Sequence, residues 1–217
     1  MKIIRLVVVG LLAGFVSLWS QARPQNLEEL RQVADSGVME AEYSLGLLYS
    51  TGRGVPKDEV KAAMWFRRAA EQGLPQAQHN LANRYQNGMG VDKDLAEAAK
   101  WFEKAAEQGA ALSQADLGVA YERGSGVDQD YSKAVKWYRK AADQGVPEAQ
   151  HNLGLMYAQG TGVRQDTVMA YVWFTISAKN GYGYAERNQA MAVKRLSSEQ
   201  RKTADALAEK WLAEHAK

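Results

Sequence analysis

The sequence predicts an all-α fold, an α/α superhelical solenoid of helix-turn-helix repeats with a period of 36 residues. Two observations support this prediction: four residue types recur at one spacing, and the apolar residues of each period fall at helical intervals. The recurrent positions are Gly37, Gly73, Gly109, Gly145 and Gly181; Tyr49, Tyr85, Tyr121 and Tyr157; Asp58, Asp94, Asp130 and Asp166; and Trp65, Trp101, Trp137 and Trp173. Because the four series share one spacing, the chain repeats a single structural unit.

The N-terminal segment, residues 1–22, has the pattern of a secretory signal peptide. Basic residues precede an apolar run over residues 6–18, and Ser20 and Ala22 place small side chains at the two positions that signal peptidase reads. An uncleaved membrane anchor is the alternative, but an apolar helix of this length spans roughly 20 Å, less than the roughly 30 Å hydrocarbon core. We therefore expect cleavage after Ala22, a periplasmic or secreted product, and no membrane span in the mature chain.

Charge and cysteine content exclude several classes of protein. Without Lys2 and Arg5 of the leader, the chain carries 25 basic and 25 acidic residues, so no basic surface for nucleic acid is expected. The sequence contains no cysteine, which excludes disulfides, thiolate metal sites, thiol nucleophiles and lipid attachment through a thiol. The fold must therefore be held together by packing.

Four whole units are predicted, at residues 41–76, 77–112, 113–148 and 149–184. The second unit illustrates the pattern, because two of its segments each carry one apolar face of a helix. These faces are made of Ala77, Leu81, Ala82 and Tyr85, and of Ala98, Trp101, Phe102, Ala105 and Ala106. Since the aromatic residues share these faces with alanines, core packing is favoured over an exposed stacking platform for bases or sugars.

A Gly-x-Gly-Val motif separates the two helices of every unit, at residues 52–55, 88–91, 124–127 and 160–163. Glycine permits the positive φ that ends a helix, and an Asp three residues after each valine is placed to cap the next one. Asp94 with Glu97 predicts a capping box, and the glycines of the Gly73 series should end the second helices. A phosphate-binding loop is the alternative for Gly-x-Gly, but such a loop follows a strand, and no strand pattern precedes these motifs.

Residues 23–40 and 185–217 are predicted to cap the two ends of the stack. At the front, a helix over residues 26–36 would pack through Leu27, Leu30 and Val33. At the back, residues 185–196 begin a fifth unit that loses its pattern. Ser197 then opens a final helix, with Gln200 at the capping-box position and one apolar face made of Leu207, Trp211 and Leu212.

The motifs Leu-Gly-x-x-Tyr, Gly-x-Gly-Val-x-x-Asp and Ala-x-x-Trp-Phe/Tyr-x-x-Ala-Ala resemble the Sel1-like repeat, a branch of the tetratricopeptide-like α/α repeats. The resemblance covers residues 27–181. It implies a right-handed solenoid whose first helices line a concave groove that binds proteins or peptides. The sequence departs from the motif at a few positions. Arg84 replaces an apolar residue, for example, and we expect its head group to reach solvent.

The resemblance also implies which side chains line the groove, with the tetratricopeptide geometry aligned on Leu81 and Tyr85. Amides can donate to and accept from an extended peptide backbone, so the polar contacts are expected from His79, Asn80, Asn83, His151 and Asn152. The apolar floor is expected from Tyr43, Leu47, Val119 and Leu155. Lysines, with which some tetratricopeptide grooves clamp a C-terminal carboxylate, are missing from the corresponding positions. A polar concave face with no single ligand is the alternative.

No catalytic site, metal site or cofactor is predicted. His79 and His151 occupy equivalent positions two units apart, roughly 20 Å at about 10 Å per helix layer, so they cannot share one metal ion. The motifs His-Glu-x-x-His, Gly-x-Ser-x-Gly and Ser-x-x-Lys are absent from the sequence. The last absence is relevant because β-lactamase activity has been attributed to some members of the family that the chain resembles.

The expected function is therefore that of a non-catalytic scaffold or adaptor in the bacterial cell envelope, which binds a protein or peptide in its concave groove. Two alternatives remain. A β-lactamase-like or cell-wall-active enzyme would turn over a chromogenic lactam or a muropeptide. A factor that assembles on peptidoglycan or on an outer-membrane complex, without a dedicated peptide ligand, would sediment with purified sacculi.

Overall fold

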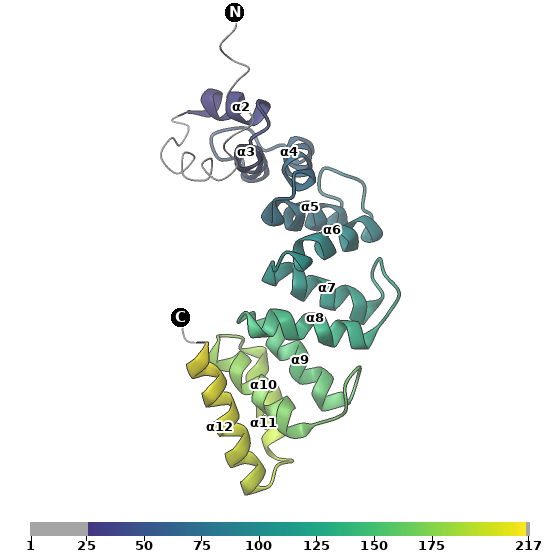
Figure 1. Ribbon diagram of the computed structural model, residues 1–217, viewed down its shortest axis with the longest axis vertical. Coiled ribbons are helices and arrows are strands. Elements are labelled where there is room, and N and C mark those ends of the chain that lie inside the picture. The colour runs from purple at the N-terminus through teal and green to yellow at the C-terminus, as the bar shows by residue number, and fades with distance from the viewer. Residues whose placement is uncertain (1–25, 216–217) are drawn as a thin grey trace, which may run out of the picture.

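The computed structural model describes residues 26–215, so the expected leader and its cleavage site lie outside the described residues. Over this range the chain folds into eleven α-helices and no strand, which confirms the predicted all-α class. The helices stack one after another into an arc that runs from α2 at one end to α12 at the other (Figure 1).

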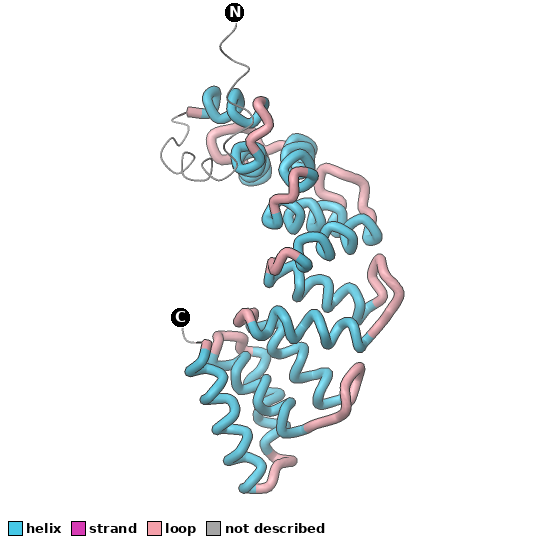
Figure 2. The backbone as a smooth tube through the Cα atoms, in the orientation of Figure 1, coloured by secondary structure: helices cyan, strands magenta, loops and turns pink. Residues whose placement is uncertain are grey.

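Four antiparallel helix pairs make up the body of the arc. The first helices are α3 (Met39–Thr51), α5 (Pro75–Asn87), α7 (Ala111–Arg123) and α9 (Pro147–Gln159). The second helices are α4 (Glu59–Glu71), α6 (Leu95–Glu107), α8 (Tyr131–Asp143) and α10 (Thr167–Lys179). Each has 13 residues and begins 36 residues after its counterpart, which confirms the predicted period. From α5 to α10, the long turns within pairs follow one edge of the arc and the short turns between pairs follow the other (Figure 2).

The core of each pair lies between an aromatic ring of the second helix and a small residue of the first. A Cβ atom added to Gly118 would lie 2.6 Å from the Tyr138 ring, and one added to Gly154 would lie 2.7 Å from the Phe174 ring. These helices therefore approach too closely for a larger side chain at that position. The four recurrent tryptophans are also buried, at 6–8% exposure, so their predicted role in core packing is confirmed.

In three of the four Gly-x-Gly turns, the second glycine makes the contact between neighbouring repeats. Gly126 has a φ of +77°, and a Cβ atom there would lie 1.9 Å from the backbone oxygen of Leu95, at the start of the preceding second helix. Gly90 and Gly162 approach the preceding repeat in the same way. The motif therefore supplies a turn and also fixes how closely one repeat stacks on the next.

Each second helix is capped by its Asp, as predicted, but the capping box at Asp94 and Glu97 is not formed. The Asp94 side chain accepts hydrogen bonds from the backbone N–H groups of Ala96 and Glu97. The backbone N–H of Asp94 donates to the carbonyl of Tyr85 at 2.9 Å, so this N–H group cannot also donate to the Glu97 carboxylate. That carboxylate instead accepts from Lys100 Nζ at 2.7 Å.

Both ends of the stack are closed by atypical helices. At the front, α2 (Leu27–Asp35) packs against the core through Leu27, Leu30 and Val33, as predicted. At the back, α11 (Tyr184–Val193) packs on α10, and α12 (Ser198–Glu214) also packs on α10. The Ser197–Gln200 capping box is present.

The predicted apolar face of α12 is wrong at Leu207, which is 42% exposed. The residues buried along this helix are Ala204 and Ala208, and Trp211 continues the same stripe. Since one helical turn has 3.6 residues, Leu207 lies beside this stripe rather than on it. Small residues therefore allow α12 to lie close to α10.

Arg84 contradicts the expectation that its head group reaches solvent, because the residue is only 4% exposed. Its guanidinium lies 5.1 Å from the Phe66 ring centre and donates to the Glu59 carboxylate and the Met89 carbonyl. Nε has no partner among the described residues. An acidic residue at the start of α4 therefore compensates the charge inside the helix layer.

Candidate partner-binding surface

The first helices present a continuous row of partly exposed side chains, which we call the first-helix surface. It consists of the side chains that the resemblance assigned to the groove, at equivalent positions of α3, α5, α7 and α9. Seven of these are half-buried and Leu47 is 38% exposed, so they are accessible; the half-buried members are Tyr43, His79, Asn80, Asn83, Val119, Asn152 and Leu155. His151 differs from the others because it is only 9% exposed.

His79 connects two neighbouring first helices. Its Nε2 accepts a hydrogen bond from Asn83 Nδ2 at 2.9 Å, and its Nδ1 lies 3.0 Å from Ser113 Oγ on α7. Because the amide can only donate from Nδ2, the proton of the neutral ring is on Nδ1. Burial lowers the pKa of His79, which favours this neutral form. The ring is thus held as a fixed hydrogen-bonding part of the surface.

Asp116 is a second ionisable group at this place, and no sequence motif singles it out. One of its carboxylate oxygens lies 3.7 Å from His79 Nδ1. Burial, together with the negative charge of Glu148, raises the pKa of Asp116 to about 6. The only signal in the sequence is that a charged residue stands at the position that Asn80 and Asn152 occupy in the neighbouring repeats.

Tyr138 forms a polar contact below the middle of the surface. It stands where the other second helices carry phenylalanine, is fully buried, and donates its hydroxyl hydrogen to the Glu122 carboxylate. Burial, together with the bond to Glu122, raises the pKa of Tyr138, so the phenol stays protonated. At the position where Tyr43, His79 and His151 contact the phenylalanine rings of their own repeats, this repeat carries the small residue Ala115.

His151 is packed beneath the last helices of the chain. Its ring centre lies 5.6 Å from that of Phe174 and 5.1 Å from that of Tyr182. Asn188 of α11 donates to its Nε2 at 2.8 Å. Burial lowers the pKa of His151, so the neutral ring is favoured. The structure therefore places His151 in the packing under α11, in contact with Asn188 and Tyr182.

The apolar and amide residues of the surface are also connected to one another. Asn80 Nδ2 donates to the Tyr43 hydroxyl at 3.3 Å and to the Gln76 carbonyl at 3.0 Å. Asn80 thus links α5 to α3, as His79 links α5 to α7. Such bonds hold the side chains of the surface in fixed positions.

The outer face of the second helices has a different character. Lys100, Lys104 and Lys136 are all exposed. Lys100 pairs with Glu97 on its own helix, and Lys104 Nζ lies 3.9 Å above the Trp101 ring. These contacts lie within single helices, as in a solvated surface.

No metal site or membrane span is evident in the part of the chain that the structure describes. Residues 26–215 hold no group of three or more His, Asp or Glu side chains that could bind a metal ion. None of the helices within this range is long and apolar enough to cross a membrane.

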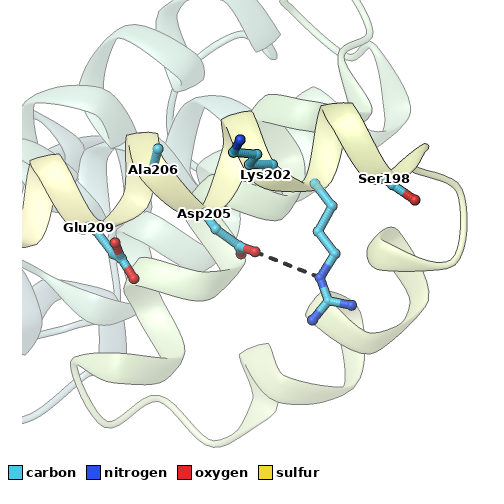
Figure 3. A pocket seen from close by; sticks show the side chains of 6 residues that line it. Ser198, Lys202, Asp205, Ala206 and Glu209 are labelled. Atoms are coloured by element: carbon cyan, nitrogen blue, oxygen red, sulfur yellow. Dashed lines mark ion pairs between the residues drawn. The ribbon is translucent and has the colours of Figure 1, made fainter.

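One hollow lies along the exposed side of α12, between Ser198 and Glu209 (Figure 3). All of its lining residues belong to this one helix, and Arg201 Nε is 3.7 Å from Asp205 Oδ2 within it. The hollow is thus open helix surface, without the converging elements that a binding cavity has.

The family model for the Sel1 repeat matches residues 40–74, 75–109, 111–146 and 147–182. The chain belongs to the Sel1 repeat family. The family model begins each unit within two residues of the predicted boundaries. Sel1 repeat proteins are typically scaffolds for protein interactions, and their fold is generally non-enzymatic.

Solved structures of Sel1 repeat proteins are similar to this chain. A protective antigen of uropathogenic Escherichia coli strains, with an SLR fold, is 38% identical and superposes with a TM-score of 0.76. The match covers 85% of this chain but only 40% of the antigen. A Sel1 repeat protein from Oxalobacter formigenes is 32% identical, with a TM-score of 0.69 over 85% of this chain and 84% of that one.

An immunity protein from Pseudomonas aeruginosa shares the fold at 19% identity, with a TM-score of 0.51 over 94% of this chain and 82% of that one. No curated protein sequence matches the chain significantly.

Proposed function

We propose that this Sel1 repeat protein is a non-catalytic scaffold of the bacterial cell envelope that holds a protein or peptide partner along its first-helix surface. One observation carries the proposal: partly exposed amide and apolar side chains follow one another along α3, α5, α7 and α9, and bonds between neighbouring helices hold them in place. A surface of this kind can bind an extended segment over several repeats.

The chemistry of the surface fits a polypeptide better than a small molecule. Asn83 donates one amide hydrogen to His79 and keeps its carbonyl oxygen available to accept from a backbone N–H. Leu47 and Val119 offer apolar contacts between the amides. Alternating amide and apolar positions match the alternating backbone and side-chain groups of a peptide, whereas a catalytic site needs several reactive groups at one point.

The envelope location rests on the leader at residues 1–22. We expect the mature protein in envelope fractions to begin at Arg23, because Ser20 and Ala22 satisfy signal peptidase. N-terminal sequencing of the protein from those fractions tests this. Recovery of Met1 from a membrane pellet would contradict it.

Partner capture by two matched triple variants tests the binding surface. We expect replacement of Asn80, Asn83 and Val119 by alanine to reduce capture from envelope extracts. The matched variant replaces Lys100, Lys104 and Lys136 by alanine and should capture normally. All six residues are at least partly exposed. Each lysine change should therefore cost about 0.5 kcal/mol or less. Asn80 and Asn83 make hydrogen bonds to neighbouring side chains and Val119 packs against the core, so each of these changes should cost about 1 kcal/mol, and both variants should remain folded.

Circular dichroism and urea melts control for folding in both triple variants. If the lysine variant loses capture while the Asn80, Asn83 and Val119 variant keeps it, the partner binds to the outer face of the second helices. The proposed surface would then be wrong.

A further inference from the structure

A cavity of about 140 Å³ opens at the C-terminal end of the first-helix surface. It lies between α9, α10 and α11, and its apolar lining includes Leu155, Ala158, Phe174 and Met191. Leu155 is a member of the first-helix surface, and Met191 stands one period after it. The cavity therefore continues the surface onto α11.

The internal repeats explain why a cavity exists here. One period earlier, the positions of Ala158, Phe174 and Ala192 are occupied by larger or polar groups, namely Glu122, Tyr138 and Met156. There the Tyr138 hydroxyl donates to the Glu122 carboxylate, and Met156 is only 2% exposed. In the last repeat the hydroxyl, the carboxylate and the long apolar chain are all missing. Three substitutions thus leave space that the preceding repeat fills.

The rim of the cavity carries donors of hydrogen bonds. Arg195 and Gln159 belong to its lining and both are exposed. Among residues 26–215, no carboxylate pairs with the Arg195 guanidinium. Asn188, also in the lining, is fixed by the hydrogen bond that it donates to His151. An exposed, unpaired arginine in the lining of an apolar cavity is complementary to a carboxylate next to an apolar side chain.

We infer that this cavity anchors the partner by one apolar side chain that stands beside a carboxylate. The volume is about that of a cavity that accepts a benzene molecule, so it fits a leucine or phenylalanine side chain. The carboxylate pairs with Arg195 and is the C-terminal carboxylate of the partner, because a C-terminal leucine or phenylalanine carries both groups on one residue, as one cavity with one arginine in its lining requires. This inference rests on the proposed function, because it names the chemistry that one part of the first-helix surface recognises.

Binding of small probes to the purified protein tests the inference without the natural partner. The probes are N-acetyl-leucine, N-acetyl-leucinamide and N-acetyl-Leu-Asp-amide, and the readout is the methyl resonance of Met191 in protein labelled with ¹³C at its methionine methyl groups. We expect this resonance to shift on titration with either acid at millimolar concentrations. The neutral leucinamide should bind about threefold to fivefold more weakly, because it lacks the carboxylate.

The two acids test the source of the carboxylate. Stronger binding of N-acetyl-leucine supports a C-terminal carboxylate, and stronger binding of the Leu-Asp probe would contradict it in favour of an internal acidic residue.

Cavity-filling variants test the apolar part of the site. Ala192→Met restores the methionine of the preceding repeat, and Ala158→Leu fills the same space from α9. Each should weaken probe binding at least about tenfold, because the leucine side chain can no longer be buried. Two independent variants guard against a failure of either one to fold, which melting curves detect.

Charge variants test the polar part. Arg195→Gln should remove the difference between N-acetyl-leucine and its amide. Arg123→Gln is the matched control, because Arg123 is exposed at the equivalent position two periods earlier and should leave binding unchanged.

Unaltered titrations in the filled variants, or no shift at Met191 up to about 20 mM probe, would overturn the inference. In either case, partner capture that still depends on Asn80, Asn83 and Val119 would leave the proposed function intact. If the probes bind but partner capture does not depend on Asn80, Asn83 and Val119, the proposed function is contradicted, whereas the inference that the cavity binds an apolar group beside a carboxylate is retained.

Discussion

Gly126→Ala should destabilise the protein by an amount that the contact between repeats determines. Two costs are expected. A φ of +77° is unfavourable for alanine by about 1–2 kcal/mol. The added methyl group would also lie 1.9 Å from the Leu95 carbonyl oxygen and 2.8 Å from the Ala96 nitrogen, so the two repeats must move apart.

Relieving such overlap by backbone shifts costs typically about 1–3 kcal/mol, so the total loss should be about 2–5 kcal/mol. Domains of this kind have about 5–15 kcal/mol of stability, so the loss is easily measured.

Gly54→Ala provides the matched control. Gly54 has a φ of +75°, but no described atom lies within 4 Å of the position of its Cβ. Only the conformational cost of about 1–2 kcal/mol should therefore appear. Urea melts followed by circular dichroism measure both variants. Equal losses in the two variants would refute the reasoning that the second glycine sets the spacing between repeats.

Four further substitutions test packing and electrostatics. Trp137→Ala, in an interior repeat, should cost about 3–5 kcal/mol of stability in urea melts. Trp211→Ala should cost less, because the tryptophan of the terminal helix is only half-buried. The opposite order would contradict the stacked arrangement of the repeats. Asp116→Asn should raise the urea midpoint above that of the wild type, and this difference should grow between about pH 4 and pH 6 and stay constant above pH 6. The reason is that the raised pKa of Asp116 makes its ionisation cost stability in the folded state. A difference in midpoint that does not change with pH would exclude this effect. Arg84→Met should change stability by less than about 1.5 kcal/mol in urea melts, since Glu59 keeps Lys57 as a partner; a larger loss would show that the buried ion pair stabilises the fold.

The fold could be predicted from the sequence because its determinants are local and repeated. The Gly-x-Gly turns, the capping aspartates and the helical spacing of Trp and Ala act within about 20 residues, and each appears four times. These signals mark the turns at which the repeated helices end and the caps at which the second helices begin. The predicted capping box at Asp94 is not formed, because the backbone N–H of Asp94 donates to the carbonyl of Tyr85. Tyr85 belongs to the preceding helix and lies outside the local motif.

The candidate site was only partly predictable. Equivalent positions on α5, α7 and α9 placed Asn83, Val119 and Leu155 on one surface, but burial at each position depends on neighbours from other repeats. His151 is covered by Tyr182 and Asn188, from a segment whose repeat pattern is lost. The cavity beside Leu155 arises from three substitutions that lie in three different helices. Such features require the packed structure.

Site-specific photo-crosslinking in intact cells tests most directly whether the partner lies on the first-helix surface. A photoreactive p-benzoylphenylalanine would replace Asn83 or Val119 on that surface, and Lys100 or Lys136 on the outer face of the second helices. We predict one covalent adduct of the same partner from both first-helix positions and no such adduct from the two lysine positions. Adducts from the lysine positions alone, or equally from both faces, would contradict the proposed binding surface.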